Sequence, residues 1–140
     1  MSVNILRFVI PKSLVEHITL DSTVRQTLEK MAYHRYTAIP VLDDAGRYAG
    51  TVRTDDIFNF FLEEGSFDKT AAEDYPVSRV MKEGYPKPIS HNTTMSVLID
   101  NVKEHNFVPV VDDRDCFIGI ILRRDILNFL LNFYNEKEED

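Results

Sequence analysis

Two stretches of this 140-residue chain carry the same short pattern, IPVLDD at residues 39–44 and VPVVDD at residues 108–113. The second stretch begins 69 residues after the first, and further identities follow in order at that offset. They pair Gly50 with Gly119, Asp56 with Asp125, Ile57 with Ile126, Asn59 with Asn128 and Phe60 with Phe129. Because chance does not align so many identities within about twenty positions, the chain contains an internal duplication.

Each copy shows the same succession of local patterns. In the first copy, an extended segment at residues 16–19 precedes the capping residues Asp21-Ser22-Thr23 and an amphipathic helix. Two strands joined by a turn, at residues 38–42 and 48–53, then lead into a helix at residues 54–64. The second copy repeats this at residues 88–90, 91–93, 107–111, 117–122 and 123 to about 134. The patterns predict two β-α-β-β-α repeats, an α/β (α+β) class.

Upstream of the shared hexapeptide, the register between the copies changes. Leu28 aligns best with Leu98, so we expect one loop of the second copy to be a residue shorter. Apolar residues at helical spacing predict the buried face of the first helix in each copy. These faces are Val24, Leu28, Met31 and Ala32, and Val97, Leu98 and Val102.

One repeat alone would leave a sheet face bare, so we expect the two to pack sheet to sheet with pseudo-twofold symmetry. Residues 4–10 and 76–81 are expected to lead into the first and the second copy. A polar, helix-breaking segment separates the repeats. The expected organisation is repeat one with its N-terminal leading segment at 1–64, a linker at 65–76, repeat two at 77–135 and a solvated acidic tail at 136–140.

The composition excludes several classes of protein. With 16 Lys and Arg against 23 Asp and Glu, the net charge of −7 disfavours partners such as nucleic acid or anionic membranes. The single cysteine, Cys116, excludes an internal disulfide and any multi-cysteine zinc site. No apolar run approaches 18 residues, and the N-terminus lacks signal-peptide features, so we expect a cytoplasmic protein.

Catalytic motifs are missing as well. The four histidines lack metal-binding spacings, and no glycine-rich phosphate loop or GxSxG motif occurs. The pairs Asp43-Asp44 and Asp112-Asp113 fall in hairpin turns, where aspartate is expected for backbone reasons, and Cys116 is expected to be structural. We therefore expect no catalytic residue, no metal and no required cofactor.

The copies differ most at the junction between the last strand and the closing helix. The first copy reads GTVRTDD at residues 50–56, and the second reads GIILRRD at residues 119–125. An aspartate in the first helical turn complements the helix dipole, but the adjacent Arg123 and Arg124 oppose it and repel each other. Such a conflict is expected mainly at functional sites. Two guanidinium groups at a helix start favour phosphate, although a solvated or intersubunit arginine pair remains the alternative.

Both copies resemble CBS domains, which occur in tandem as a Bateman module, and the resemblance extends from about Val15 to Phe133. It rests on the Pro-containing strand, the glycine of the last strand and the Gly-to-Asp run. It implies two clefts for adenosine ligands. The first would use Glu16, His17, Ile18, Tyr36, Thr37, Ala38, Ile39, Pro40, Leu122, Arg123, Arg124 and Asp125. The possible second would use Arg53, Thr54, Asp55, Asp56, Phe107, Val108 and Pro109, and we expect its acids to repel phosphate.

Among stand-alone tandem CBS proteins, the chain most resembles the small bacterial group that binds cyclic di-AMP. The shared features are its length, VEHI at residues 15–18, YTAIPVLD at residues 36–43 and the double arginine. The resemblance implies phosphate contacts from Arg123 and Arg124, an adenine beside Tyr36, and an apolar slot. The residues expected to line that slot are Ile18, Ala38 and Ile39.

The resemblance therefore predicts a non-catalytic, regulatory homodimer that senses an adenine nucleotide and acts on an effector protein. In that group, the (p)ppGpp synthetase/hydrolase is one such partner. Two alternatives stay open: a sensor of AMP, ATP or S-adenosyl methionine, and a ligand-free dimerisation module. The apolar helix residues that would form the dimer face are Phe58, Phe61, Leu62, Leu127, Leu130 and Leu131.

Overall fold

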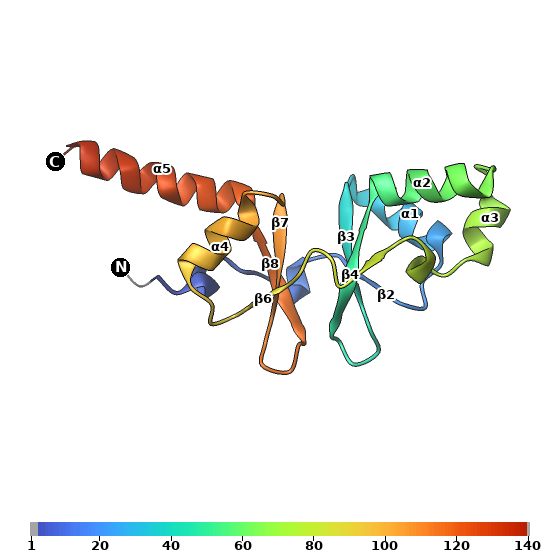
Figure 1. Ribbon diagram of the computed structural model, residues 1–140, viewed down its shortest axis with the longest axis horizontal. Helices are drawn as coiled ribbons and strands as arrows, with labels where there is room; N and C mark the ends of the chain where they lie inside the picture. The colour runs from blue at the N-terminus through green and yellow to red at the C-terminus, as the bar shows by residue number, and fades with distance from the viewer. Residues whose placement is uncertain (1–2, 140) are drawn as a thin grey trace. The chain divides into compact units, whose positions relative to one another are not determined.

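The computed structural model describes residues 3–139, with side chains as far as residue 136, and it divides into two compact units. One unit consists of residues 16–85, and the other joins residues 3–15 to residues 86–139. Each unit contains one four-stranded sheet, and Figure 1 labels the elements of both. No helix among the described residues is long and apolar enough to cross a membrane.

The unit of residues 16–85 contains the first repeat. Its elements are β2 (Ile18–Thr19), α1 (Val24–His34), β3 (Ala38–Leu42), β4 (Tyr48–Arg53), α2 (Thr54–Glu64), α3 (Lys69–Asp74), a 3-10 turn (Val77–Arg79) and β5 (Lys82–Glu83). The strand order is β2-β3-β4-β5, with β2 and β3 parallel and the other pairs antiparallel. Helices α1 and α2 pack against the sheet through a shared apolar core (Figure 1).

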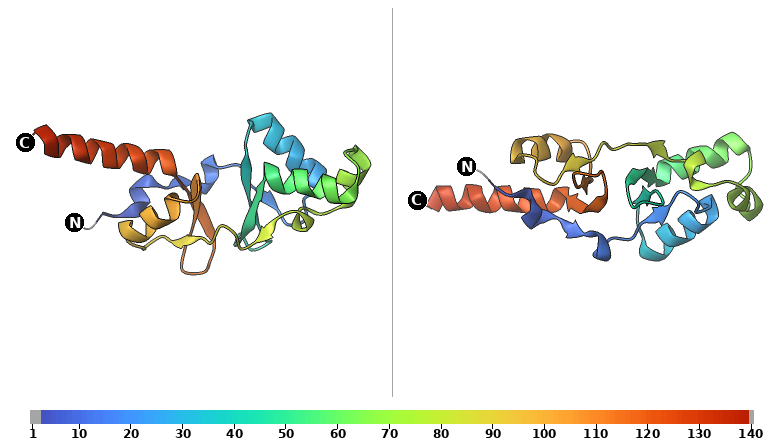
Figure 2. Two further views of the ribbon diagram at one scale, coloured as in Figure 1. Left: turned by 45° about the horizontal axis from the view of Figure 1, so that its top comes forward. Right: turned by 90° about the horizontal axis from the view of Figure 1, so that it is seen from below.

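The second unit repeats this arrangement. Its elements are 3-10 turns at Ile5–Phe8 and Lys12–Leu14, β1 (Ile10–Pro11), β6 (Ile89–Ser90), α4 (Met95–Val102), β7 (Phe107–Val111), β8 (Phe117–Leu122) and α5 (Arg123–Glu139). The strand order is β1-β8-β7-β6, with β6 and β7 parallel. Figure 2 shows α4 and α5 beside this sheet in two further views. Both units therefore confirm the predicted β-α-β-β-α order, and α5 extends through most of the expected acidic tail.

The leading segments belong to the opposite repeats from those expected. Ile5, which is 1% exposed, joins the core of the second repeat, whereas Val77, fully buried, joins that of the first. Strand β1 pairs with β8, and β5 pairs with β4. The observed boundaries at 15/16 and 85/86 differ from the expected 64/65 and 76/77 because these edge strands complete sheets that are distant in sequence.

A glycine of the last strand lies beside β1 in one unit and beside β5 in the other. A Cβ on Gly119 would come within 2.1 Å of the Ile10 carbonyl oxygen, and one on Gly50 within 2.6 Å of the Lys82 carbonyl oxygen. Both residues also have positive φ angles, 156° and 155°, which side chains strongly disfavour. The duplicated glycine therefore allows an edge strand to approach the last strand of each repeat.

The predicted helix register was wrong by one residue. Thr23 caps α1 and Thr94 caps α4, so the helices correspond at an offset of 71, and two residues are missing before β7. Leu98 consequently occupies the buried position of Thr27, whereas Leu28 is 39% exposed. A helix turns about 100° per residue, so this shift alters the buried face.

The expected linker also contains a helix. Gly65 ends α2 as the helix-breaking composition indicates, but Asp68 then caps α3 and accepts a hydrogen bond from the Ala71 backbone N–H at 2.9 Å. Ala72 of α3 is buried against the core of the first repeat, which explains why this short polar helix is formed.

Candidate functional site

The double arginine begins α5, directly after β8. The Arg123 guanidinium donates from Nε to the Val102 carbonyl oxygen at 2.6 Å and from Nη2 to the Lys103 carbonyl oxygen at 3.3 Å. Its Nη1 donates to Oδ1 of Asn106 at 3.1 Å, and its backbone N–H donates to the Asn106 carbonyl oxygen at 2.8 Å. The segment between α4 and β7 therefore accepts hydrogen bonds from this side chain.

Arg124 is in a different environment. Its side chain is 76% exposed, and Nε lies 4.0 Å from Oδ1 of the neighbouring Asp125. An exposed ion pair of this length contributes little, of the order of 0–1 kcal/mol. The guanidinium of Arg124 is therefore accessible to an anionic ligand at the first turn of α5.

Both arginines line a cavity of about 420 Å³ within the second unit. Its walls combine amide, guanidinium and apolar side chains from Asn106, Leu122, Arg123, Arg124, Leu127, Asn128 and Leu131. Such a lining suits a ligand that carries both an anionic group and a flat apolar part. Three of the predicted site residues, Leu122, Arg123 and Arg124, meet here.

Glu16, predicted for the first cleft, lies beside α1 in the first unit and forms an ion pair with Lys30. Its carboxylate lies 3.1 Å from Nζ of Lys30 and 3.7 Å from Nε2 of His34. Hydrogen bonding by Lys30 holds the pKa of Glu16 below its usual value. Lys30 also donates to the carbonyl oxygen of His17 at 2.9 Å, so this network positions the segment before β2.

Tyr36 lies half-buried before β3, and its ring stacks on His34 with centroids 5.3 Å apart and planes at 27°. It also lines a cavity of about 340 Å³ together with Leu28, Met31, Ala32, Arg35, Thr54 and Ile57. The His34 ring of the same unit therefore covers part of the Tyr36 ring.

The other predicted residues of this unit lie along β2 and β3. Ile18 and Ile39 belong to its buried core, so the expected slot lacks their exposed side chains. Pro40 is buried as well, Ala38 is half-buried, and Thr37 is exposed and accepts a hydrogen bond from the Thr54 backbone N–H at 3.0 Å.

The second predicted set is also divided between the units, with four residues in the first and three in the second. In the first unit, Oδ2 of Asp56 accepts a hydrogen bond from the Arg53 backbone N–H at 2.9 Å, whereas Asp55 is exposed. The Arg53 guanidinium lies 5.5 Å from the centre of the Tyr85 ring. In the second unit, Phe107 is half-buried in β7, and Val108 and Pro109 are buried there.

The hairpin aspartates act on the backbone, as predicted. Oδ1 of Asp43 accepts hydrogen bonds from the N–H groups of Ala45 and Arg47, both at 2.9 Å. Oδ1 of Asp112 likewise accepts from Arg114 at 2.8 Å and from Cys116 at 3.0 Å. These donors hold the pKa of both carboxyls below the usual value.

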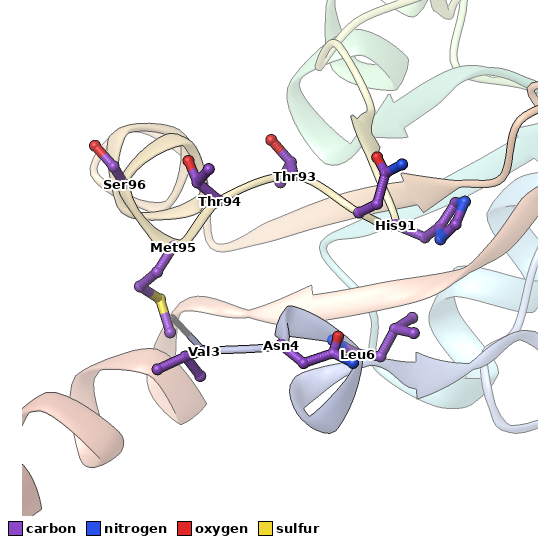
Figure 3. A pocket seen from close by; sticks show the side chains of 9 residues that line it. Val3, Asn4, Leu6, His91, Thr93, Thr94, Met95 and Ser96 are labelled. Atoms are coloured by element: carbon purple, nitrogen blue, oxygen red, sulfur yellow. The ribbon is translucent and has the colours of Figure 1, made fainter. Parts of the chain in front are cut away.

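A cavity of about 760 Å³ lies elsewhere in the second unit, between the N-terminal segment and the start of α4. Figure 3 shows Met95 reaching from α4 toward Val3. None of the predicted site residues lines this cavity. Among residues 3–139, moreover, no group of three or more His, Cys, Asp or Glu side chains is arranged to hold a metal ion.

Sequence reasoning missed the partners of the predicted residues. Lys30 and His34 are four residues apart on α1, a spacing that places both on one helix face beside Glu16. That spacing was a usable signal. The acceptors of Arg123 come from the last residue of α4 and the connection after it, about 20 residues earlier, and no local pattern identifies them.

Known proteins similar to this chain share both its sequence pattern and its fold. Cyclic di-AMP receptor B of Bacillus subtilis (strain 168) is 32% identical over 126 residues, which cover 89% of this chain and 84% of that protein. The Listeria monocytogenes CbpB protein, solved in complex with c-di-AMP, is 25% identical, with a TM-score of 0.83 over 95% of this chain and 98% of its own.

Another crystal structure of CbpB in complex with c-di-AMP has a TM-score of 0.85 and 19% identity, and it covers 99% of this chain and 91% of its own. At that identity, the likeness concerns the fold alone. The model of the CBS domain matches residues 10–63 and 74–132, most of the chain and both repeats. This protein therefore belongs to the CBS domain family, with two CBS domains in tandem.

Proposed function

We propose that this protein is a non-catalytic regulatory sensor that binds cyclic di-AMP. The observation that carries the proposal is the guanidinium of Arg124 at the first turn of α5, which is 76% exposed and lines a cavity. A guanidinium there, beside the N–H groups of a helix start, suits a phosphodiester. Cyclic di-AMP carries two such groups.

The similarity to cyclic di-AMP receptor B supports this ligand, because it extends over 84% of that protein at 32% identity. The Listeria monocytogenes CbpB protein, 25% identical, was likewise solved with c-di-AMP. For this chain we propose Arg124, at the first turn of α5, as a phosphate contact.

An AMP, ATP or S-adenosyl methionine sensor is the second candidate. Asp125, whose side chain is 39% exposed beside Arg124, favours it, since a carboxylate accepts hydrogen bonds from a free ribose diol. Cyclic di-AMP has no free 2′,3′ diol, because each 3′ oxygen belongs to a phosphodiester. The two candidates therefore predict different roles for Asp125.

Calorimetric titration with cyclic di-AMP, AMP, ATP and S-adenosyl methionine tests the proposal. We expect cyclic di-AMP to bind most tightly, and Arg124→Ala to weaken it roughly 10- to 100-fold through loss of a charge-assisted hydrogen bond. Arg114→Ala is the matched control, since it removes the same charge from an exposed turn of the same unit. Tighter binding of AMP, sensitive to Asp125→Asn, would favour the second candidate.

We further propose that the protein is a homodimer. Phe58 and Leu62 on α2 are 57% and 55% exposed, and Leu127 and Leu131 on α5, at the same offset of 69, are 51% and 57% exposed. Apolar side chains that recur at equivalent places on two helices suit burial by a second copy. Sedimentation equilibrium should give a dimer for the wild type and a monomer for Phe58→Glu/Leu62→Glu, which lies outside the cavity of Arg124.

A sensor of this kind acts through a partner protein. Cyclic di-AMP changes the affinity for an effector only if it binds the two states of the sensor with different strength. The resemblance to small CBS proteins suggests a (p)ppGpp synthetase/hydrolase as the first effector to test. Titrating that enzyme with the ligand-free and the ligand-saturated protein should give different dissociation constants, and equal constants would contradict the proposed regulation.

A further inference from the structure

We infer that Arg123 is a positioning residue, which fastens the end of α4 to the start of α5, and that Arg124 alone of the pair contacts the ligand. This division of roles rests on the proposed function where it concerns the ligand. The part that concerns Arg123 and α4 stands on the contacts of the second unit alone.

All four hydrogen bonds of Arg123 that begin from its guanidinium or its backbone N–H reach residues 102–106. Their acceptors are neutral oxygens, two of them carbonyls at the end of α4. The last carbonyls of a helix lack partners within the helix, and a cation there also complements the helix dipole. The charge of Arg123 is unfavourable at the N-terminal end of α5. At the C-terminal end of α4, the same side chain donates hydrogen bonds to carbonyl oxygens and complements the dipole of that helix.

The first repeat closes the equivalent helix differently. Arg35 ends α1 in the left-handed conformation at φ 59°, and its N–H reaches the Ala32 carbonyl oxygen at 3.3 Å. The Tyr36 N–H donates to the Met31 carbonyl oxygen at 2.8 Å, which completes a turn of the Schellman type. Backbone groups thus close the end of α1.

In the second repeat the helix itself is shorter, since α4 has 8 residues and α1 has 11. Lys103 after α4 stays right-handed, at φ −60°. The guanidinium of Arg123 supplies donors to the carbonyls of Val102 and Lys103. Thr54 occupies the position of Arg123 in the first repeat, and there only the backbone bond to the preceding connection is shared. We therefore assign Arg123 as compensation for the earlier end of α4.

The consequence for the site is mechanical. Arg123 adjoins Arg124, so a fixed Arg123 holds the first turn of α5 against the α4–β7 connection and limits where Arg124 can point. The planar guanidinium serves acceptors in three directions, which an ammonium group on a flexible stem cannot reproduce. Lysine at position 123 should therefore fail to replace it.

Hydrogen exchange, melting temperature and cyclic di-AMP titration of Arg123→Ala, Arg123→Lys and Arg124→Ala test this inference, with Arg114→Ala as the control. Without ligand, we expect both Arg123 variants to speed amide exchange at residues 103–106 at least about tenfold and to lower Tm by about 4 °C or more. Arg124→Ala and Arg114→Ala should leave exchange and Tm at wild-type values.

With ligand, Arg124→Ala should weaken binding more than Arg123→Ala and should also flatten its dependence on salt, because a charge contact is lost. Arg123→Ala should weaken binding several-fold with the wild-type salt dependence. The inference is overturned if Arg123→Ala keeps the exchange rates and Tm of the wild type but loses affinity and salt dependence as Arg124→Ala is expected to do. Arg123 would then be a ligand contact.

Asn106→Ala keeps the inference testable if Arg123→Ala does not fold. It removes one acceptor of the guanidinium without changing charge, and it should speed exchange at residues 103–105 by a smaller factor. Unchanged exchange in Asn106→Ala would count against the inference. If the wild type binds no cyclic di-AMP, the proposed ligand is wrong, but the ligand-free exchange and Tm measurements still decide the role of Arg123.

Discussion

At the start of α2 the chain reads Arg53-Thr54-Asp55-Asp56, and at the start of α5 it reads Leu122-Arg123-Arg124-Asp125. The backbone is the same in both places, since the first N–H of each helix donates to the connection before the Pro-containing strand, at 3.0 Å and 2.8 Å. The exposed side chain that follows is Asp55 in one repeat and Arg124 in the other. The duplicated scaffold thus presents opposite charges at equivalent positions.

This comparison separates scaffold residues from site residues. Gly50 and Gly119 are identical in both repeats because each adjoins an edge strand that a Cβ would contact. That constraint does not act at positions 123 and 124, where the residues differ from Thr54 and Asp55 of the first repeat. Residues that differ between the repeats therefore indicate function better than residues that are identical. Arg123 is an exception, because its hydrogen bonds to residues 102 and 103 explain it.

The largest expected effect concerns the shared glycine. Gly119→Ala places a Cβ 2.1 Å from the Ile10 carbonyl oxygen and forces a disfavoured φ, so β1 must separate from β8. We expect the free energy of unfolding to fall by about 3 kcal/mol or more. Gly50→Ala, with 2.6 Å to the Lys82 carbonyl oxygen, should cost less. Urea unfolding measures both, and the reverse order would contradict the edge-strand explanation.

The next effect exchanges the charges that distinguish the repeats. Arg124→Asp should lower the affinity for cyclic di-AMP by about 100-fold or more, since it replaces a phosphate donor with a repelling carboxylate. Asp55→Arg, the reciprocal change, should not weaken binding, and both should stay within about 0.5 kcal/mol of the wild-type stability. Wild-type affinity in Arg124→Asp would show that the proposed contact does not exist.

The smallest expected effect concerns the turn aspartates Asp43 and Asp112, at which the two repeats should respond to pH in the same way. Backbone donors hold the pKa of Asp43 and Asp112 below the usual value in the folded protein. The stability they contribute is present above the unfolded pKa of about 3.9, and it is lost as pH falls through the lower folded pKa. Below about pH 4, the free energy of unfolding of the wild type should fall as the pH is lowered. In Asp43→Asn and in Asp112→Asn it should fall less steeply than in the wild type. An unchanged decline in the double variant would contradict this assignment.

Local patterns predicted the hairpins and the start of each closing helix correctly. Strands β3, β4, β7 and β8 have the expected bounds, because strand periodicity, turn aspartates and the repeated glycine all act within a few residues. The first helix of each repeat was predicted less well. Its register depends on which threonine caps it, and neighbouring capping residues compete for that position.

The ligand-contact residues stay a prediction, although some features of their surroundings could be predicted from the sequence. The unusual cation pair was visible in the chain, and Arg124 is exposed as a ligand contact requires. The unfavourable placement of Arg123 at the start of α5 was also visible in the sequence. The hydrogen bond that explains it, to the Val102 carbonyl oxygen at the end of α4, was not. Similarly, burial of Ile18 and Ile39 in the core removes them from the expected apolar slot, which an apolar residue type alone does not reveal.

The duplication, the element order and the position of the charged junction follow from the amino-acid sequence, because each depends on short-range spacing and residue type. The exchange of leading segments and the role of Arg123 follow only from the folded chain. Edge-strand pairing and helix-end capping use backbone groups, which every residue carries. Tertiary packing therefore decides which distant segment satisfies them, as it does for Ile10 beside Gly119 and for Val102 beside Arg123.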